Sequence, residues 1–103
     1  MKRWSVRLRA QAHQDIRDVF ELVLETSGHL QTAENLANRI YDACEALGYF
    51  PEKGRDRNDL LPGLRVFPFE RVAVIAYRIT GDDVEILNIF YGGRDWETIV
   101  GGE

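Results

Sequence analysis

The feature that most constrains the fold of this chain is a change in the spacing of its apolar residues near the middle. In the first half, apolar residues recur every three or four positions, as on one face of an amphipathic helix. In the second half, residues 71–79 and 84–91 form nearly continuous apolar runs, separated by the turn-forming residues 80–83. This order predicts helices first and a β-hairpin afterwards.

The first half of the chain predicts one short strand and two helices. Residues 4–8 alternate between apolar and polar, which is typical of a half-buried strand. The first helical stripe consists of Ala12, Ile16, Val19, Phe20 and Val23, and the second of Ala33, Leu36, Ala37, Ile40, Cys44 and Leu47. We expect Gly28 to end the first helix, Thr32 to cap the second and Pro51 to stop it. Two such helices with a short connection form an antiparallel hairpin.

The second half predicts three antiparallel strands. A polar loop over residues 52–59 leads to a short strand over residues 64–67, which Pro68 confines to an edge or an end. The two longer runs follow as hairpin partners, and residues 94–100 predict a final helical turn. A length of 103 residues suits one domain. We therefore expect one α+β domain over residues 1–103, with an N-terminal strand, a helix hairpin and a three-stranded antiparallel meander.

Several classes of site are absent from the sequence. Cys44 is the only cysteine, which excludes an internal disulfide, and its place on the apolar stripe predicts a core residue. His13 and His29 are isolated, so no metal site or other cofactor site is predicted. No apolar stretch reaches the roughly 20 residues of a membrane helix, and no apolar run follows the basic N-terminus. We expect a soluble cytoplasmic protein.

The charge is unevenly distributed along the chain. The net charge is −4, which argues against nucleic acid as the main partner. Between Lys53 and Arg78, however, basic residues outnumber acidic ones by six to three, so the remainder carries most of the negative charge. A positive sheet face opposed to acidic helices suits an acidic protein segment as partner.

Three short motifs in order indicate a family. They are a Gly54-Arg55 turn, the sequence Gly63-Leu64-Arg65, and residues 91–96, which read Tyr-Gly-Gly-Arg-Asp-Trp. Together with the helices and strands, they resemble the toxins of the ParE/RelE superfamily. Residues 91–96 are similar to the His-Gly-Ala-Arg-Asp motif of the ParE branch. The resemblance spans roughly residues 4 to 96 and implies that the first strand joins the sheet edge and the helix hairpin covers one face.

The resemblance implies a function as well as a fold. ParE toxins are the toxic halves of bacterial type II toxin–antitoxin pairs. Those with an assigned target poison DNA gyrase by binding, without enzymatic activity, and a ParD-like antitoxin neutralises them. The resemblance thus implies an antitoxin and gyrase as partners, with no cofactor, no direct nucleic-acid binding and no membrane.

Two other functions remain open from the sequence. The RelE branch consists of ribosome-dependent mRNA endonucleases that need no metal, and Arg65 and Arg71 fall at the places of their arginines. Tyr91 would then move the proton, because Gly92 and Gly93 cannot. The other possibility is a partner domain that has lost its toxicity and retains only antitoxin binding.

Five residues are the candidates for contact with the target or the antitoxin. They are Arg65, Arg71, Tyr91, Arg94 and Trp96. Each also has a structural explanation. Arg94 could pair with Asp95 or a helix carboxylate, and Trp96, with Ile99 and Val100, could cap an open edge of the core.

The two strand arginines, Arg65 and Arg71, need a carboxylate partner if they lie on a sheet face that no helix covers. The resemblance implies that the C-terminal segment of the antitoxin supplies this carboxylate. Within the chain, Glu85 on the neighbouring strand is the competing partner.

Overall fold

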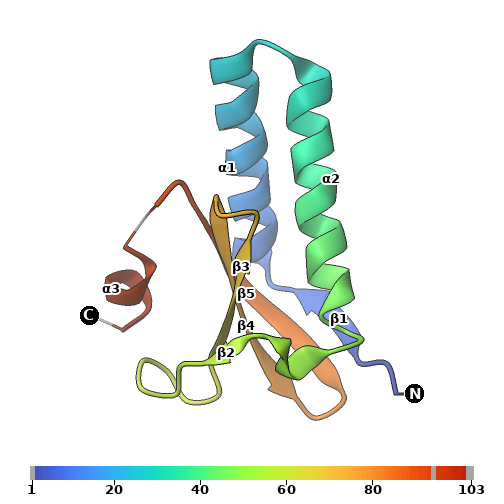
Figure 1. The fold of residues 1–103 in the computed structure, drawn as a ribbon, viewed down its shortest axis with the longest axis vertical. Helices are drawn as coiled ribbons and strands as arrows, with labels where there is room; N and C mark the ends of the chain where they lie inside the picture. The colour runs from blue at the N-terminus through green and yellow to red at the C-terminus, as the bar shows by residue number, and fades with distance from the viewer. Residues whose placement is uncertain (1, 94, 102–103) are drawn as a thin grey trace.

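The helices and strands follow the predicted order, with two additions before the meander. The computed structural model describes residues 2–93 and 95–101. In chain order the elements are β1 (Ser5–Leu8), α1 (Ala10–Ser27), α2 (Leu30–Ala46), the 3₁₀-helix η1 (Pro51–Lys53), β2 (Arg55–Asp56), β3 (Arg65–Phe69), β4 (Ala73–Thr80), β5 (Asp83–Tyr91) and α3 (Trp96–Gly101). The helix hairpin lies on one side of the sheet and α3 on the other (Figure 1).

Within the described residues, the sheet has five strands in the order β1-β5-β4-β3-β2. The neighbours β3, β4 and β5 form the predicted antiparallel meander. The first strand, β1, pairs parallel to β5 at one edge, with Ser5 opposite Asp83 and Leu8 opposite Ile86. The predicted α+β architecture and the edge position of the first strand are confirmed.

The other edge of the sheet holds a strand that the sequence did not predict. Arg55 and Asp56, expected in a polar loop, form β2 and pair with Val66 and Arg65 of β3. Pro68 lies beyond the end of β2, where it pairs with Val74 of β4 on one side alone. The missing N–H of proline is tolerated there, so Pro68 stands at an open edge as expected.

The helix ends confirm one of the two predicted caps. Gly28 has φ 73° and donates its backbone N–H to the carbonyl of Leu24, as a left-handed residue after a helix does. The prediction for Thr32 is wrong, because α2 begins at Leu30 and its N-cap is His29, which makes no side-chain cap hydrogen bond. Thr32 lies inside the first turn instead.

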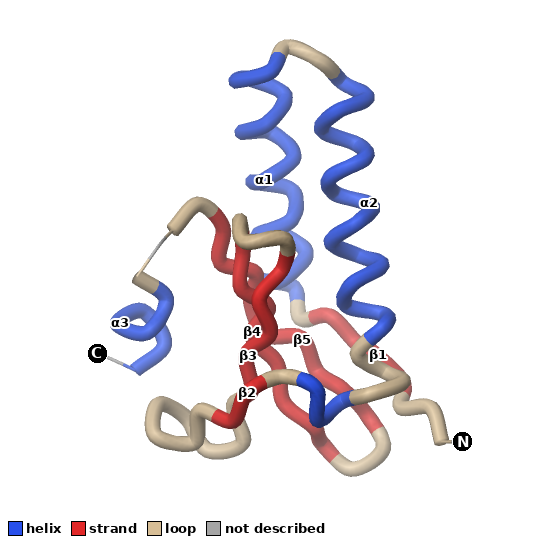
Figure 2. The backbone as a smooth tube through the Cα atoms, viewed as in Figure 1, coloured by secondary structure: helices blue, strands red, loops and turns tan. Residues whose placement is uncertain are grey.

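Two apolar clusters cover the two faces of the sheet. The larger cluster lies between the sheet and the helix hairpin and includes Cys44, which is fully buried there as predicted. The smaller cluster lies on the opposite face, where Leu64, Val66 and Phe90 pack with partly buried residues of α3. The tube in Figure 2 shows β4 in the middle of this arrangement.

The helix hairpin extends well past the sheet. Figures 1 and 2 show that the loop between α1 and α2 lies far from any strand. Of the two helices, α1 packs directly on β5, whereas α2 packs mainly against α1. Part of the inner surface of the hairpin is therefore left uncovered by the sheet. In the described part of the chain, neither helix combines the length and apolarity that crossing a membrane requires.

Candidate interaction surfaces

Arg65 lies on the helix-facing side of β3, opposite Tyr77 of β4. Its Nη1 donates a hydrogen bond of 2.8 Å to the carbonyl of Gly54, with a longer contact of 3.4 Å to the carbonyl of Glu52. Arg65 therefore does not lie on the face opposite the helix hairpin, so the condition under which it would need a carboxylate partner is not met. Arg65 stabilises the backbone that joins η1 to β2.

Tyr77 is the residue that sequence reasoning missed in this network. Its buried hydroxyl donates to the carbonyl of Pro51 at 2.6 Å and accepts from the N–H of Gly54 at 2.8 Å. Burial raises the pKa of Tyr77, although the hydrogen bond from Gly54 opposes the shift. A Cβ at Gly54 would lie 2.4 Å from this hydroxyl, so the turn needs glycine for space. A tyrosine within an aliphatic strand was the available signal, because its hydroxyl needs a partner when buried.

Glu85, the expected intramolecular partner of Arg65 and Arg71, binds two other arginines. Its carboxylate accepts from Arg9 at 2.9 Å and from Arg78 at 2.9 Å. These hydrogen bonds hold the pKa of Glu85 below its usual value. At Glu85, β5 thus carries charge pairs within the chain.

Arg71 lies in a tight turn and not on a strand, because β4 begins only at Ala73. Glu70 and Arg71 have φ values of 47° and 63°, and the N–H of Val72 donates to the carbonyl of Phe69 at 2.9 Å. Two central residues with positive φ are typical of a type I′ turn, which usually contains asparagine or glycine. The structure therefore places Arg71 at the exposed tip of a strained turn.

Arg39 of α2 holds this turn against the helix hairpin. Its guanidinium binds the carboxylate of Glu70 through two hydrogen bonds, Nε at 2.9 Å and Nη2 at 3.2 Å. This pairing raises the pKa of Arg39. Both side chains are about half exposed, so the pair contributes at most about 1 kcal/mol to stability.

Tyr91 lies on the helix-facing side, at the end of β5 that is nearest to this turn. It lines a cleft of about 370 Å³ together with Val23, Leu36 and Val72. We call this the hairpin cleft. The Arg39–Glu70 pair forms part of the same lining, so the cleft lies between the overhanging helices and the β3–β4 turn.

The three residues of the nuclease hypothesis are not brought together. Arg65 pairs with Tyr77, whereas Tyr91 pairs with Ala73, four residues away along β4. At about 3.3 Å per residue, this separation is on the order of 13 Å. Arg71 lies near the Tyr91 end, far from Arg65.

Trp96 begins α3 and packs on the smaller apolar cluster. Its ring stacks on Phe90 with centroids 6.4 Å apart, and the guanidinium of Arg57 lies 5.3 Å from the ring centroid. Arg57 also binds the carboxylates of Asp59 and Glu97. Trp96 therefore does cap the core. It also remains partly exposed, next to Arg71, in a hollow of about 320 Å³.

Arg94 lies outside the described residues. Its proposed intramolecular partner, Asp95, is described, and its carboxylate accepts from the hydroxyl of Thr98 at 2.6 Å. Its carboxylate also accepts from the backbone N–H of Thr98 at 3.4 Å, as the N-cap residue of a helix does, so Asp95 caps the short helix α3.

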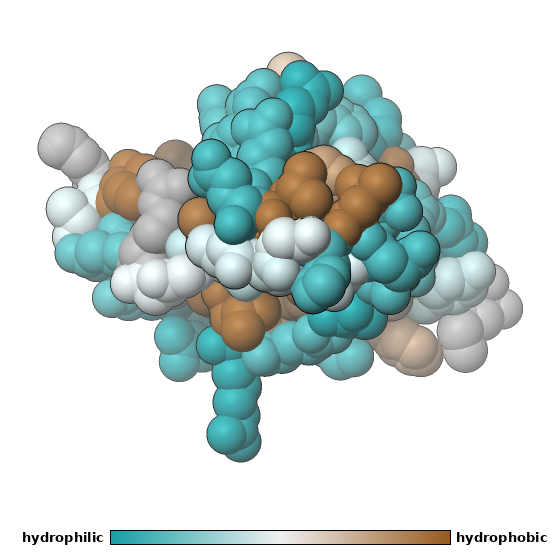
Figure 3. Space-filling view, turned by 90° about the horizontal axis from the view of Figure 1, so that it is seen from above, coloured by the Kyte–Doolittle hydropathy of each residue, from teal (hydrophilic) through white to brown (hydrophobic). Residues whose placement is uncertain are grey.

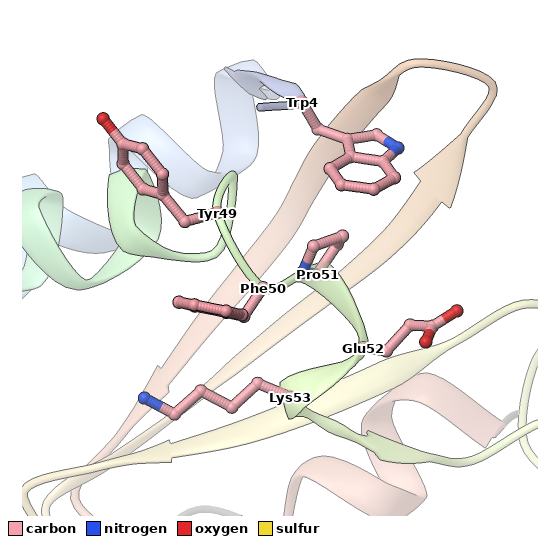
Figure 4. Close-up of a pocket in the computed structure, with 6 residues that line it drawn as sticks. All are labelled: Trp4, Tyr49, Phe50, Pro51, Glu52 and Lys53. Atoms are coloured by element: carbon pink, nitrogen blue, oxygen red, sulfur yellow. The ribbon is translucent and has the colours of Figure 1, made fainter. Parts of the chain in front are cut away.

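A further hollow of the described surface lies near the N-terminus. It has a volume of about 590 Å³ and is lined by Trp4, Tyr49, Phe50, Pro51, Glu52 and Lys53. Figure 4 shows Trp4 beside Pro51, while Phe50 and Lys53 project to the other side. Phe50 is 60% exposed. Figure 3 shows further hydrophobic side chains exposed among polar ones when the molecule is seen from above.

No group of three or more His, Cys, Asp or Glu side chains within the described residues could hold a metal ion. Cys44 is buried, and burial together with the charge of Glu45 raises the pKa of its thiol to about 12. A thiol in this state is a poor nucleophile.

Comparison with known proteins gives consistent matches. Residues 6–96 match the family model described as "ParE toxin of type II toxin-antitoxin system, parDE". Over 78 residues the chain is 44% identical to Toxin ParE3 of Caulobacter vibrioides, an alignment that covers 76% of each protein.

A solved structure described as "Chromosomal ParDE TA system from P. aeruginosa" contains a chain of similar fold. The TM-score is 0.75 and the identity 21%, over 86% of this chain and 96% of that one, so this likeness concerns the fold alone. The family model spans most of the chain, and the identity to ParE3 extends over three quarters of it. The chain therefore belongs to the ParE toxin family of type II toxin–antitoxin systems.

Proposed function

We propose that this ParE-family toxin acts by binding and not by catalysis, that it poisons DNA gyrase in the cytoplasm, and that a ParD-like antitoxin neutralises it. The observation that supports binding over RNA cleavage is the placement of Arg65. Its guanidinium is used to hold the backbone at Gly54, about 13 Å along the sheet from Tyr91. A general base must lie within hydrogen-bond reach of its substrate group, together with the residues that stabilise the phosphate.

The hairpin cleft is the proposed antitoxin site. Its lining combines apolar side chains of α1, α2 and β5 with Val72, which is 37% exposed. Leu22 and Leu30, at the overhanging end of the hairpin, are also exposed, at 46% and 54%. An amphipathic helix that lays its apolar face into such a groove would cover this surface.

The gyrase proposal is tested by a supercoiling assay with purified gyrase, relaxed plasmid and the purified toxin, with and without ATP. We expect linear DNA to accumulate as the toxin is added, because a poison traps the enzyme on cleaved DNA. Addition of the antitoxin should abolish this product. Normal supercoiling at a large excess of toxin would rule out gyrase as the target.

The nuclease hypothesis is tested with Tyr91→Phe, which removes the only phenol available for proton transfer near the end of β5. On translating ribosomes we expect no toxin-dependent mRNA cleavage, and growth inhibition by the variant should equal that of the wild type. Loss of toxicity in Tyr91→Phe, together with mRNA cleavage by the wild type, would favour the RelE-type activity.

The antitoxin site is tested with Val72→Asp, which places a charge in the hairpin cleft. We expect antitoxin affinity, measured by isothermal titration calorimetry, to fall by about tenfold or more, because burying an unpaired charge is costly. Ile99→Asp on α3 is the matched control, since Ile99 is 50% exposed on the opposite side of the sheet. Equal affinities for the two variants would contradict this placement.

Normal growth of cells that express the toxin alone would indicate a chain that has lost toxicity.

A further inference from the structure

A hollow between the two long helices brings polar and apolar side chains together away from the surfaces described above. It has a volume of about 290 Å³ and shares no lining residue with the hairpin cleft. Its lining consists of six side chains, three of them polar: His13, Ile16, Arg17, Phe20, Ala37 and Tyr41. We call it the helix–helix hollow. An apolar depression with a few convergent polar groups is the usual form of a small-molecule site.

The antiparallel arrangement of α1 and α2 explains why these residues meet (Figure 1). His13, Arg17 and Phe20 follow one another along one face of α1, and Ala37 and Tyr41 lie one turn apart on α2. His13 contacts Tyr41. Arg17, one turn further along α1, therefore lies level with Ala37, one turn back along α2. Because the side chain of alanine is a single methyl group, the space beside Arg17 stays open.

Arg17 supplies a positive charge that the chain itself does not compensate. It is exposed and forms no ion pair or hydrogen bond with any described residue. The nearest acids along α1 are engaged elsewhere, since Asp15 accepts from a backbone N–H of β5 and Asp18 accepts from Gln14. Glu21 lies one turn after Arg17, which is the weaker order for an ion pair on a helix. The guanidinium is thus available to bind an oxyanion through two parallel hydrogen bonds.

Tyr41 determines which nitrogen of His13 is left to bind a ligand. Its hydroxyl lies 3.0 Å from Nδ1 of His13, and Nε2 has no partner among the described residues. When the hydroxyl donates to Nδ1, the neutral imidazole carries its proton on Nε2, and the protonated imidazole carries one there as well. In both forms Nε2 donates a hydrogen bond. Tyr41 is therefore a positioning residue for a second donor beside Arg17.

The rest of the lining suits a flat apolar group. Ile16 is only 2% exposed and forms the floor, whereas Phe20, Ala37 and Tyr41 are partly buried and form the walls. The ring of Tyr41 is tilted by 41° against that of His13, with centroids 5.9 Å apart. An aromatic ring can pack against such walls in an offset or edge-to-face arrangement. The hollow thus combines a place for a ring with donors for an anion.

We propose that the helix–helix hollow binds a small aromatic phosphate monoester. Two phosphate oxygens accept from the guanidinium of Arg17 and the third accepts from Nε2 of His13, while the ring packs on Ile16 and Phe20. A carboxylate has only two oxygens, which the arginine alone occupies, so it makes less use of the second donor. The proposal depends neither on gyrase being the target nor on the antitoxin site.

The experiment is a titration of the full chain followed by two-dimensional amide NMR, with phenyl phosphate as the probe. Inorganic phosphate tests the anion alone, benzyl alcohol the ring alone, and benzoate the other oxyanion. We expect phenyl phosphate to give saturable shifts at the amides around the hollow, with a dissociation constant on the order of 1 mM, as for a ligand of this size. Each of the other three probes should bind more weakly, by about threefold or more.

Two variants test the charge and the space separately. Arg17→Gln removes the charge and should weaken phenyl phosphate by about fivefold or more. Ala37→Leu fills the space and should weaken phenyl phosphate more than inorganic phosphate. Glutamine and leucine both favour helix, so the fold is retained, which circular dichroism checks. Arg55→Gln is the matched control, because Arg55 is also exposed and without an ion pair to any described residue but lies on β2, and it should leave the affinity unchanged.

The role of Tyr41 has its own readout in the ring nitrogens of His13. In Tyr41→Phe we expect the NMR signals of these nitrogens to move towards a mixture of the two tautomers, and the affinity for phenyl phosphate to fall by about threefold. The ring of His29, which lies in the loop between the helices, should keep its signals and serves as the internal control. Unchanged His13 signals in Tyr41→Phe would overturn this positioning role.

Four results would overturn the proposal of the site itself. The first is the absence of saturable shifts with phenyl phosphate. The second is inorganic phosphate binding as tightly as phenyl phosphate, which would indicate an adventitious ion only. The third is benzoate or benzyl alcohol binding as tightly as phenyl phosphate, which would remove the role of the phosphate group. The fourth is an equal loss of affinity in Arg17→Gln and Arg55→Gln.

Discussion

At the scale of single residues, one hydroxyl determines how the segment between α2 and β2 is held. Tyr77 Oη satisfies both the carbonyl of Pro51 and the N–H of Gly54, and Arg65 adds a hydrogen bond to the carbonyl of Gly54. The 3₁₀-helix η1 is thus fixed to the central strand by side chains. Lys53 and Phe50, which flank the hollow of Figure 4, depend on this fixation for their positions.

Replacing Tyr77 with phenylalanine tests this arrangement. Tyr77→Phe leaves a buried carbonyl and a buried N–H without their partner, so we expect a loss of about 1–3 kcal/mol in the free energy of unfolding. Urea denaturation followed by circular dichroism measures it. Tyr41→Phe is the control, since its hydroxyl contacts His13 at an exposed position. A cost for Tyr77→Phe no larger than that of the control would contradict the role of the hydroxyl.

At the type I′ turn of Glu70 and Arg71, in contrast, we expect a substitution that increases stability. A non-glycine residue with positive φ costs about 1–2 kcal/mol relative to the right-handed region, so Arg71→Gly should stabilise the fold by about 1 kcal/mol. Thermal unfolding measures the change. Arg71→Val, with a β-branched side chain at the same φ, should destabilise it. If both variants unfold at the same temperature, the turn is not strained at this position.

At this scale the sequence supported some predictions and not others. The core position of Cys44 followed from its place on an apolar helical stripe, and it is confirmed. The placement of Arg71 on a strand is wrong, because a turn made of Glu and Arg lacks the Asn or Gly that would reveal it. The role of Arg65 depends on a backbone carbonyl eleven residues away, which no local pattern contains.

At the scale of elements, a single acid of α1 joins the helix hairpin to an irregularity in β5. The pairing of β4 with β5 shifts register between Ala76 and Tyr77, so that Leu87 is an extra residue in β5. Asp15 is buried at 7% exposure and accepts from the N–H of Ile89 at 2.8 Å. Gln11 donates to its other oxygen at 2.8 Å. This carboxylate fixes the position of α1 on the sheet.

Removing the carboxylate should affect both elements. We expect Asp15→Ala to destabilise the fold by about 1–3 kcal/mol, because the buried N–H of Ile89 loses its acceptor. Hydrogen exchange detected by NMR should show faster exchange of the Ile89 amide than in the wild type. Asp18→Ala on the exposed face of α1, where Asp18 accepts from Gln14, is the control and should change stability by about 0.5 kcal/mol or less. Unchanged protection of Ile89 in Asp15→Ala would contradict this link.

The order of the elements was predictable because each long element carries its own periodicity. The stripes of α1 and α2 and the two runs of β4 and β5 needed no tertiary information. The two-residue strand β2 was not predictable, because it forms only where β3 offers its edge. Thr32 was a plausible cap by type, but the helix begins two residues earlier with no side-chain cap.

At the scale of the whole molecule, two buried groups make stability depend on pH in the alkaline range. The thiol of Cys44 has its pKa raised to about 12 by burial first and then by the charge of Glu45, and burial also raises the pKa of Tyr77. In the unfolded chain both groups lose their protons at lower pH. The folded state therefore loses stability as the pH rises above about 9 and through about 12.

The measurement is urea denaturation at a series of pH values from neutral to alkaline. Between pH 9 and 11 we expect the free energy of unfolding to fall by up to about 1.4 kcal/mol per pH unit because of the Cys44 thiol, and Tyr77 adds to this fall only above the ordinary tyrosine pKa of about 10. Cys44→Ala should show a shallower fall, because one of the two groups is gone. The same slope in the wild type and in Cys44→Ala would show that the thiol does not contribute.

The candidate surfaces were only partly predictable at this scale. Arg71 and Trp96, both chosen from the sequence, do lie beside one hollow. Lys53 and Arg55 line the adjoining hollow, but only a regional excess of positive charge could be predicted for this segment. Which cations are free depends on which carboxylates the fold engages, as Arg39 engages Glu70. These pairings can be read from the folded structure but not from the sequence.

The parallel pairing of β1 with β5 has a consequence for how the chain is made. Ser5 is opposite Asp83, so the first strand leaves the ribosome long before its partner is synthesised. Asp15 likewise has no hydrogen-bond donor at this position until Ile89, whose N–H it accepts, has been synthesised. Until the last third of the chain emerges, the apolar stripes of the hairpin have no sheet to cover them. A nascent chain of this toxin therefore completes this fold only after β5 has emerged, and until then chaperones can act on the uncovered hairpin.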